Sequence, residues 1–223
     1  MSIFALTPSL DGYVSNLFQT TWVAVHDATS GTDVDKTSVS AVIRAEEPAG
    51  ETFHMARFFL VFDLSTISGS AMLASDAVTL VTNITSITAT GDDYKTLHLV
   101  SSTQASNTDL VLGDFDQRGS TNWATPVVGA VGSNTLTLNT TGRSALQSAF
   151  GGYFKMCIIM KYDFDNTDPA VGDGRIGSID TVDNATPGNR PTLNFVNLDV
   201  QSAENWAEPG FTSYRIKDEV VGY

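Results

Sequence analysis

The stretch that decides the fold of this 223-residue chain is Arg57-Phe58-Phe59-Leu60-Val61-Phe62-Asp63-Leu64-Ser65-Thr66-Ile67. Its apolar run is rich in aromatic and β-branched residues, too short to span a membrane and too dense for an exposed sheet edge. The run therefore predicts a central β-strand with both faces covered. Asp63 and residues 65–70 should end this strand, because such residues favour turns, and a second strand is expected at 77–82.

Working outward, short alternating or apolar segments separated by turns predict further strands. They lie within Phe4–Val14, Val39–Ala45, Lys95–Val100, Thr135–Asn139, Phe154–Tyr162 and Arg190–Val196. The segments Ala28–Thr37, Asp114–Thr125 and Asp163–Gly177 are polar and are expected to be loops, whereas Thr141–Phe150 is the best helix candidate. The pattern predicts an all-β fold for residues 1–200, a jelly-roll-type antiparallel two-sheet sandwich with one short helix.

Composition narrows the range of partners. The 42% hydrophobic content suffices for a full core, while the net charge of -13 leaves only 12 Lys and Arg residues, spread along the chain. A nucleic-acid interface needs clustered basic residues, so nucleic acid is excluded as the main partner, and an anionic membrane surface is disfavoured. The single cysteine, Cys157, lies in an apolar run and is expected to be a buried thiol that acts as a small hydrophobe.

Catalytic chemistry has little support in the sequence. His26, His54 and His98 lie in or beside separate predicted strands, without a metal-ligand spacing or a neighbouring nucleophile. No nucleophile elbow or phosphate-binding loop is present. The chain is therefore predicted not to be an enzyme.

Calcium is the one ion that the sequence suggests. Asp163, Asp165 and Asp168 could supply the hard oxygen ligands that Ca²⁺ prefers, and Asp114-Phe115-Asp116 is a weaker set. The alternative is a solvated loop in which the aspartates accept hydrogen bonds from nearby amides. Because the full spacing of a calcium loop is missing, the solvated loop is preferred and no cofactor is predicted.

Sugar binding needs an exposed aromatic platform beside amide and carboxylate groups. Trp123, next to Asn122, is the best candidate, and Tyr94 in its acidic turn is the second. The alternative for Trp123 is that it closes one end of the sandwich core. Arg57 and Arg190 could pair with acidic sugars, but framework roles, in ion pairs or in hydrogen bonds to the backbone, are preferred.

The last segment, residues 201–223, differs in character from the rest. Its aromatic residues lie among polar ones without a clear period, and they suit anchors at a protein interface: Trp206, Phe211, Tyr214 and Tyr223. The segment is therefore predicted to be a C-terminal extension that docks on a partner. The alternative is that it packs back on its own sandwich.

Several motifs together resemble DNRLRE-type domains, the β-sandwich class that includes alginate-binding carbohydrate modules. Asp11-Gly12-Tyr13-Val14 resembles the opening strand of that class, and Arg57–Ile67 resembles its signature strand. Ser120–Trp123 is similar to the Trp-bearing loop, and Asn189–Phe195 resembles the closing strand. The chain departs from the pattern at Ser68, where the family usually has proline. The resemblance implies a sandwich fold and a polysaccharide ligand.

Two functions follow as hypotheses. The first is a structural or adhesive surface component of a phage-like virion, such as a decoration, fibre or tail-associated protein, made in the host cytoplasm because no secretory signal or transmembrane window is recognisable. Its partners would be copies of itself and capsid or tail proteins. The second is an extracellular polysaccharide-binding module, and a β-sandwich lyase or hydrolase is the least favoured alternative.

Overall fold

The organising strand is β5 (Phe53–Asp63), which in the computed structural model begins before Arg57. Every residue from Phe53 to Phe62 is buried, as predicted for a strand covered on both faces. The strand ends at Asp63, whose carboxylate accepts a hydrogen bond of 2.9 Å from the backbone N–H of Ser65. The Asp63 side chain thus offers the backbone N–H of Ser65 a hydrogen bond that replaces pairing with a neighbouring strand, and the turn begins there.

The structure describes residues 2–48, 52–67, 77–88, 91–169, 171 and 175–197. The strands before β5 are β1 (Ser2–Leu6), β2 (Leu10–Gln19), β3 (Asp33–Asp35) and β4 (Ser40–Glu46). Those after it are β6 (Thr79–Ser86), β7 (Thr96–Ser102), β8 (Arg118–Asn122), β9 (Val127–Val128), β10 (Gly132–Thr137), β11 (Tyr153–Met160), β12 (Arg175–Asp180) and β13 (Thr192–Asn197).

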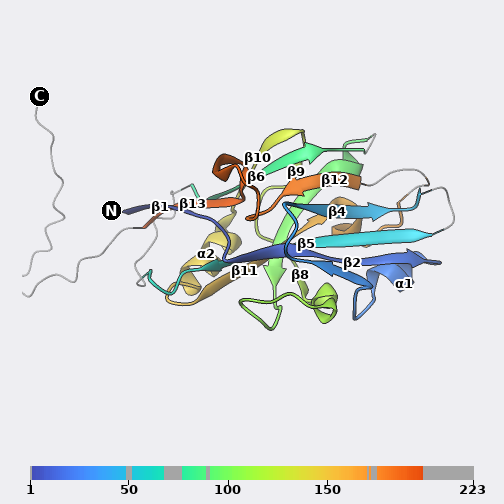
Figure 1. Ribbon diagram of the computed structural model, residues 1–223, viewed down its shortest axis with the longest axis horizontal. Coiled ribbons are helices and arrows are strands. Elements are labelled where there is room, and N and C mark those ends of the chain that lie inside the picture. The colour runs from blue at the N-terminus through green and yellow to red at the C-terminus, as the bar shows by residue number, and fades with distance from the viewer. Residues whose placement is uncertain are drawn as a thin grey trace, which may run out of the picture.

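The strands form a jelly-roll-type antiparallel sandwich, and its two sheets are joined where one strand changes partners (Figure 1). One edge of β5 pairs with β2, while the other edge pairs with β4 at residues 54–56 and with β11 at residues 58–63. The first sheet therefore runs β3-β2-β5-β11-β7-β8. The second is built around β6, which pairs with β10 on one edge and with β13 and β12 on the other. Arg57 lies at the point where the sheets separate.

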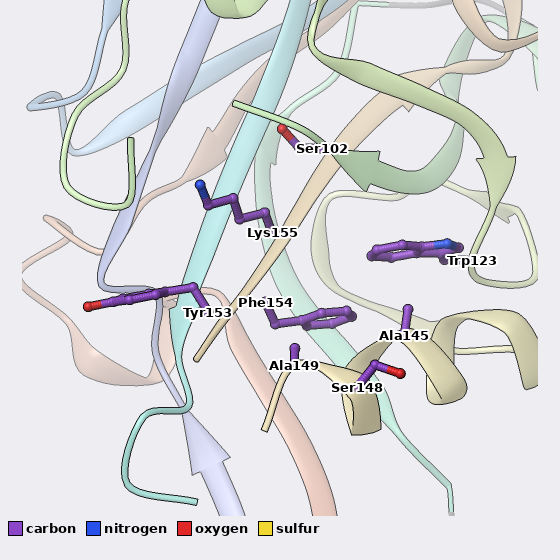
Figure 2. A pocket seen from close by; sticks show the side chains of 8 residues that line it. All are labelled: Ser102, Trp123, Ala145, Ser148, Ala149, Tyr153, Phe154 and Lys155. Atoms are coloured by element: carbon purple, nitrogen blue, oxygen red, sulfur yellow. The ribbon is translucent and has the colours of Figure 1, made fainter. Parts of the chain in front are cut away.

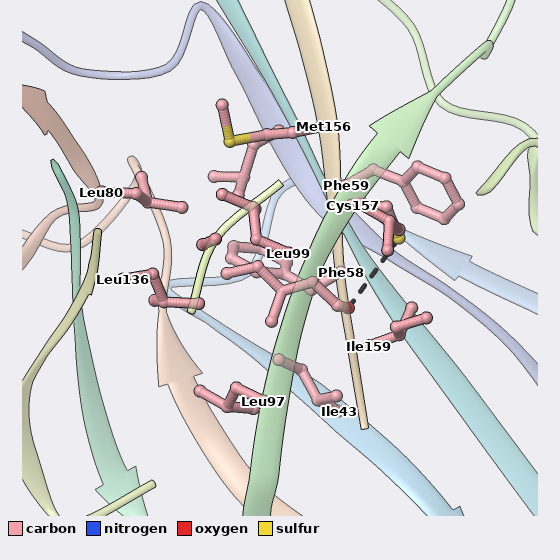
Figure 3. Packing of buried hydrophobic residues seen from close by; sticks show 14 of the residues in the cluster. Ile43, Phe58, Phe59, Leu80, Leu97, Leu99, Leu136, Met156, Cys157 and Ile159 are labelled. Atoms are coloured by element: carbon pink, nitrogen blue, oxygen red, sulfur yellow. Dashed lines mark hydrogen bonds between the residues drawn. The ribbon is translucent and has the colours of Figure 1, made fainter. Parts of the chain in front are cut away.

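A single apolar core fills the space between the sheets (Figure 3). Leu80 and Leu136 from the second sheet meet Phe58 and Leu99 from the first in one cluster of buried residues. Cys157 is buried in this cluster, and burial raises the pKa of its thiol. The prediction that Cys157 acts as a small buried hydrophobe is confirmed.

The helices differ from the prediction in number. The expected helix is present as α2 (Thr140–Ser148), but the described residues also contain α1 (Trp22–His26) and α3 (Lys161–Asp165), together with the short 3₁₀ turns η2 (Asp93–Lys95), η3 (Leu112–Asp116) and η4 (Pro187–Asn189). At the start of α1, the hydroxyl of Thr21 accepts a hydrogen bond from the backbone N–H of Ala24, which satisfies one of the free amides of the first turn. Each of the two unpredicted helices, α1 and α3, has only five residues. A segment this short does not repeat the 3.6-residue hydrophobic pattern by which a helix is recognised in a sequence.

Three strands lie where loops were expected, namely β3, β8 and β12. They are short and largely polar, so their conformation depends on pairing with a neighbouring strand more than on their own pattern. In the described part of the chain no helix is long and apolar enough to cross a membrane. Residues 201–223 lie outside the described residues.

Candidate functional site

An open hollow of about 380 Å³ lies where β7, β11 and α2 come together (Figure 2). Its lining combines aromatic, small and polar side chains: Ser102, Trp123, Ala145, Ser148, Ala149, Tyr153, Phe154 and Lys155. Small residues of α2 and its C-cap leave the space open, because Ala145, Ser148 and the C-cap Ala149 follow one another at spacings of three and one on the side of the helix that lines the hollow. The hollow is thus a surface feature with an aromatic wall.

Trp123 forms part of that wall. Its backbone N–H donates to the carbonyl of Leu99 on β7 at 2.7 Å, and its ring stacks on that of Phe154, with centroids 5.2 Å apart and an interplanar angle of 3°. Phe154 is buried, so Trp123 covers the end of the core with one face while it also lines the hollow. The two sequence interpretations of Trp123, a core plug and an exposed platform, therefore both describe part of its environment.

Asn139 holds Trp123 in place from the start of α2. The backbone N–H of Asn139 donates to the carbonyl of Trp123 at 2.8 Å, and its side-chain amide donates to the carbonyl of Asn122 at 2.8 Å. The side-chain oxygen of the same residue accepts from the N–H of Gly142 at 3.0 Å and so caps the helix. One asparagine thus fixes both α2 and the tryptophan loop.

Another part of the lining is polar. The ammonium of Lys155 donates to the backbone carbonyl of Gln104 at 2.7 Å, and the hydroxyl of Ser102 donates to the side-chain carbonyl of Gln104 at 3.1 Å. Burial lowers the pKa of Lys155, while the negative charge of Asp114 acts in the opposite direction. Gln104 is buried and its amide nitrogen makes no hydrogen bond. Lys155 and Ser102 thus form a fixed polar wall, and the ammonium of Lys155 retains further donors.

This arrangement suits a ligand with both apolar and hydroxylated surfaces. The ring of Trp123 can contact apolar C–H groups, and Tyr153, which is 39% exposed and shares a face of β11 with Lys155, offers a second aromatic surface. The hydroxyls of Ser102 and Ser148 and the ammonium of Lys155 can hydrogen-bond to the polar rim of such a ligand. A sugar ring has these two kinds of surface.

The other predicted sugar-binding residues, Asn122 and Tyr94, belong to two different elements, β8 and η2. Asn122 is partly buried beside Trp123, and its side-chain oxygen is enclosed without a hydrogen-bond partner. Tyr94 belongs to η2, which precedes β7, whereas Ser102 in the hollow is at the far end of that strand. The backbone at Tyr94 is therefore separated from Ser102 by the length of β7.

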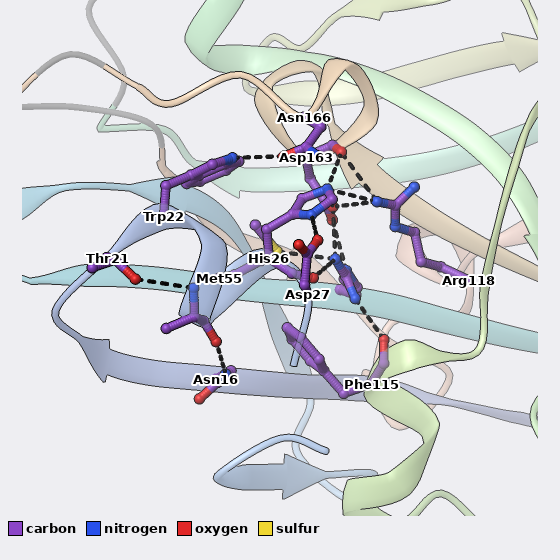
Figure 4. Close-up of polar contacts among 12 residues, drawn as sticks. Asn16, Thr21, Trp22, His26, Asp27, Met55, Phe115, Arg118, Asp163 and Asn166 are labelled. Carbon is purple, nitrogen blue, oxygen red and sulfur yellow. Dashed lines mark hydrogen bonds and ion pairs between the residues drawn. The ribbon is translucent and has the colours of Figure 1, made fainter. Parts of the chain in front are cut away.

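Asp163 has a structural partner in place of a metal (Figure 4). Arg57 donates two hydrogen bonds of 2.8 Å to its carboxylate, and each of the two side chains is 1% exposed. Although burial alone would raise the pKa of Asp163, the charge and hydrogen bonds of Arg57 lower it. This bidentate geometry keeps the carboxylate ionised, and both of its oxygens are already bound by Arg57.

The three predicted calcium ligands are accordingly not gathered at one point. Asp165 pairs with Lys161, Asp168 is exposed, and within the described ranges no group of three or more acidic, histidine or cysteine side chains could hold a metal. The prediction placed Asp163 in a solvated loop. The structure places it on α3, facing the core, because an arginine in the central strand needs a buried partner.

Arg57 has the framework role that the sequence favoured. Its guanidinium also donates to the carbonyls of Phe115 at 2.7 Å and His26 at 3.1 Å, and it lies 4.2 Å from the centroid of the Phe115 ring. These contacts tie α1, η3 and α3 to β5 at the point where the sheets separate. Arg190 likewise donates to a backbone carbonyl, that of Asn184, at 2.8 Å.

Four residues that line the hollow were not predicted from the sequence: Ser102, Ser148, Tyr153 and Lys155. Tyr153 and Lys155 flank buried Phe154 at the start of a predicted strand, which was the available signal. The predicted docking residues Trp206, Phe211, Tyr214 and Tyr223 lie outside the described residues.

The chain matches no protein-family model, and no curated protein matches it. The fold and the hollow define an all-β sandwich with an aromatic-walled surface site. The resemblance to DNRLRE-type domains stays a prediction.

Proposed function

We propose that this protein is a non-catalytic adhesive protein that binds carbohydrate in the hollow beside Trp123. The observation that carries the proposal is the combination of aromatic and polar side chains in the lining of one open surface site. Aromatic rings and hydroxylated sugars are complementary in this way, since a sugar has apolar C–H faces and a rim of hydroxyl groups.

A non-catalytic role is supported by the buried charged groups, because they form ion pairs and hydrogen bonds with one another. Arg57, Asp163 and Arg118 are committed to one another, and the ring of His26 contacts Arg118 at 2.7 Å. These groups serve to hold helices and turns against the central strand. The hollow, in contrast, is lined by aromatic, small, hydroxyl and lysine side chains, and the described residues that line it include no carboxylate.

The test is glycan binding by the wild-type protein and by Tyr153→Ala. Tyr153 is partly exposed in the hollow, so its removal should leave the fold intact and weaken binding of a glycan found on an array at least tenfold. Phe18→Ala is the matched control, because Phe18 is an exposed aromatic residue of β2, outside the hollow lining. Equal binding by all three proteins, measured by calorimetry, would exclude the hollow as the site.

The setting that we propose for this adhesive protein is the surface of a phage-like virion. The proposal rests on a sandwich with a buried free thiol and on the aromatic residues of the segment 201–223. Deleting residues 201–223 should then abolish incorporation into particles and leave glycan binding in the hollow unchanged. Incorporation of the truncated chain at the wild-type level would count against this setting.

A further inference from the structure

The first strand, β1, forms an outer edge of the second sheet. Among the described residues β1 pairs with β13 alone, in a continuous five-residue register from Ser2 opposite Asn197 to Leu6 opposite Leu193. In an antiparallel pair, alternate backbone N–H and C=O groups of an edge strand point away from the sheet. β1 therefore presents backbone groups that another strand could bind, at one end of the molecule (Figure 1).

This edge is held in place by the core. The ring of Phe4 stacks on that of Phe195 with centroids 5.0 Å apart, and Phe195 in turn lies 5.8 Å from Phe150. Phe4 and Leu6 pack against the core cluster, so the other face of β1 carries Ile3 and Ala5 outward. Ile3 is 81% exposed and lies opposite Val196 of β13. The edge is thus preformed, and its outer face is apolar.

Two other edge strands, β3 and β8, carry features that oppose strand addition, whereas β10 differs from β1 only in the polarity of its exposed side chains. β3 has aspartates at both ends, and β8 begins with Arg118 and pairs with β7 in an interrupted register. β10 is uncharged, but its exposed side chains are polar. Natural edge strands are commonly protected by charges, prolines and bulges, and Ser2–Leu6 contains neither a charged residue nor a proline.

We propose that β1 is a self-association edge, on which β1 of a second copy of this chain adds in antiparallel orientation. Charge favours a copy of the same chain as the partner. An isologous contact places the segment Ser2–Leu6 against itself, and this segment lacks the negative charge that makes other surfaces of a chain with net charge -13 repel one another. Ile3 and Ala5 would then pack on the same two residues of the copy, extending the sheet across a twofold axis.

The expected association is reversible, because a five-residue strand pair buries less area than a standard stable interface. Light scattering over a range of concentrations should show the mass rising from one chain toward two. Ile3→Lys should weaken this dimer at least tenfold by placing a charge on the edge. Val23→Lys is the matched control, since Val23 is 65% exposed on α1 and the substitution adds the same charge.

Cross-linking tests the geometry independently of the lysine variant. Cys157 is buried, so a cysteine introduced at position 3 or 5 is the accessible thiol. Proteins with Ile3→Cys or Ala5→Cys, oxidised alone and as a mixture, should form disulfide-linked dimers in one of these samples at least tenfold faster than Val23→Cys. Directly opposite residues of antiparallel strands share a face, which limits the pairs to 3 with 3, 5 with 5 or 3 with 5.

Three results would overturn the proposal. A wild-type protein that stays monomeric at every concentration would mean that the edge is covered, for example by the chain's own residues 198–223. A dimer that Ile3→Lys leaves intact would place the interface elsewhere, as would cross-linking at the control rate. The inference does not rest on the proposed carbohydrate site, because the hollow shares none of these residues.

Discussion

Two buried aspartates of this protein have opposite ionisation behaviour because their partners differ. Asp163 is 1% exposed and receives two hydrogen bonds from the charged guanidinium of Arg57, and its pKa is lowered. Asp11 is 2% exposed, accepts one hydrogen bond of 2.8 Å from the N–H of Val182, and has a second oxygen without a partner. Burial of Asp11 raises its pKa to about 7, against the effect of Val182 and with a contribution from the charge of Asp183.

Asp11 should make the protein less stable as the pH rises from about 4 to about 7. In this window the folded protein holds a proton that the unfolded chain, with a carboxyl pKa of 3.8, has released. The free energy of unfolding therefore falls by up to about 4 kcal/mol, and the loss is complete above the folded pKa. Asp11→Asn should flatten this dependence in urea titrations, whereas Asp168→Asn, at an exposed position, should retain it. A wild-type stability that rises through this window would contradict the assignment.

The pair of Arg57 and Asp163 should be strongly coupled. Arg57→Met leaves a buried carboxylate whose remaining ion-pair partners among the described residues are Arg118 and His26, and Asp163→Leu leaves a buried guanidinium, so each change should cost about 3–5 kcal/mol. The double variant should lose clearly less than the sum, because neither charge is then left without its partner. Chemical denaturation of the four proteins measures the coupling, and additive losses would show that the two side chains act independently.

At the scale of elements, the sequence predicts those strands and helices that are determined by a local pattern of apolar residues. The central strand, the strand of Cys157 and α2 follow from apolar runs and a helix signal, and all three are present. The hollow could not be predicted as a unit. Ser102, Trp123, Ser148 and Lys155 come from separate segments, and they meet only because β7 and β11 pair in one particular register.

The contact between α2 and the tryptophan loop depends on Gly142. A Cβ at this position would lie 2.3 Å from the carbonyl oxygen of Trp123, which is backbone and cannot rotate away. Alanine is a better helix former than glycine by about 1 kcal/mol, but overpacking of this kind costs roughly 1–3 kcal/mol. Gly142→Ala should therefore lower stability and change the environment of Trp123.

Gly188→Ala is the control for that substitution, because a Cβ at position 188 meets nothing within 4 Å. Thermal unfolding of both variants measures the change in stability, and their tryptophan fluorescence reports the environment of Trp123. If Gly142→Ala were as stable as the wild type, with unchanged fluorescence, α2 would not hold Trp123 by this contact, and the shape of the hollow would have another origin.

At the scale of the whole molecule, acidic residues are in large excess over basic residues. The 25 Asp and Glu residues outnumber the 12 Lys and Arg residues, and several of the latter are already in ion pairs, such as Lys36 with Asp109 and Lys95 with Asp92. Exposed ion pairs contribute only about 0–1 kcal/mol each to folding stability, so screening of these attractions by salt costs little stability. The excess of negative charge repels itself in the folded state, and salt screens this repulsion over about 10 Å.

The melting temperature should therefore rise when NaCl is increased from ~20 mM to ~300 mM, by about 2–4 °C for each kcal/mol of repulsion that is screened. Asp168→Lys, which reverses one exposed charge, should be more stable than the wild type at low salt and should gain less from added salt. Chloride is the suitable anion, because sulfate also strengthens apolar burial. A melting temperature that falls with NaCl would mean that attractive pairs, not the excess carboxylates, dominate the electrostatic energy of this sandwich.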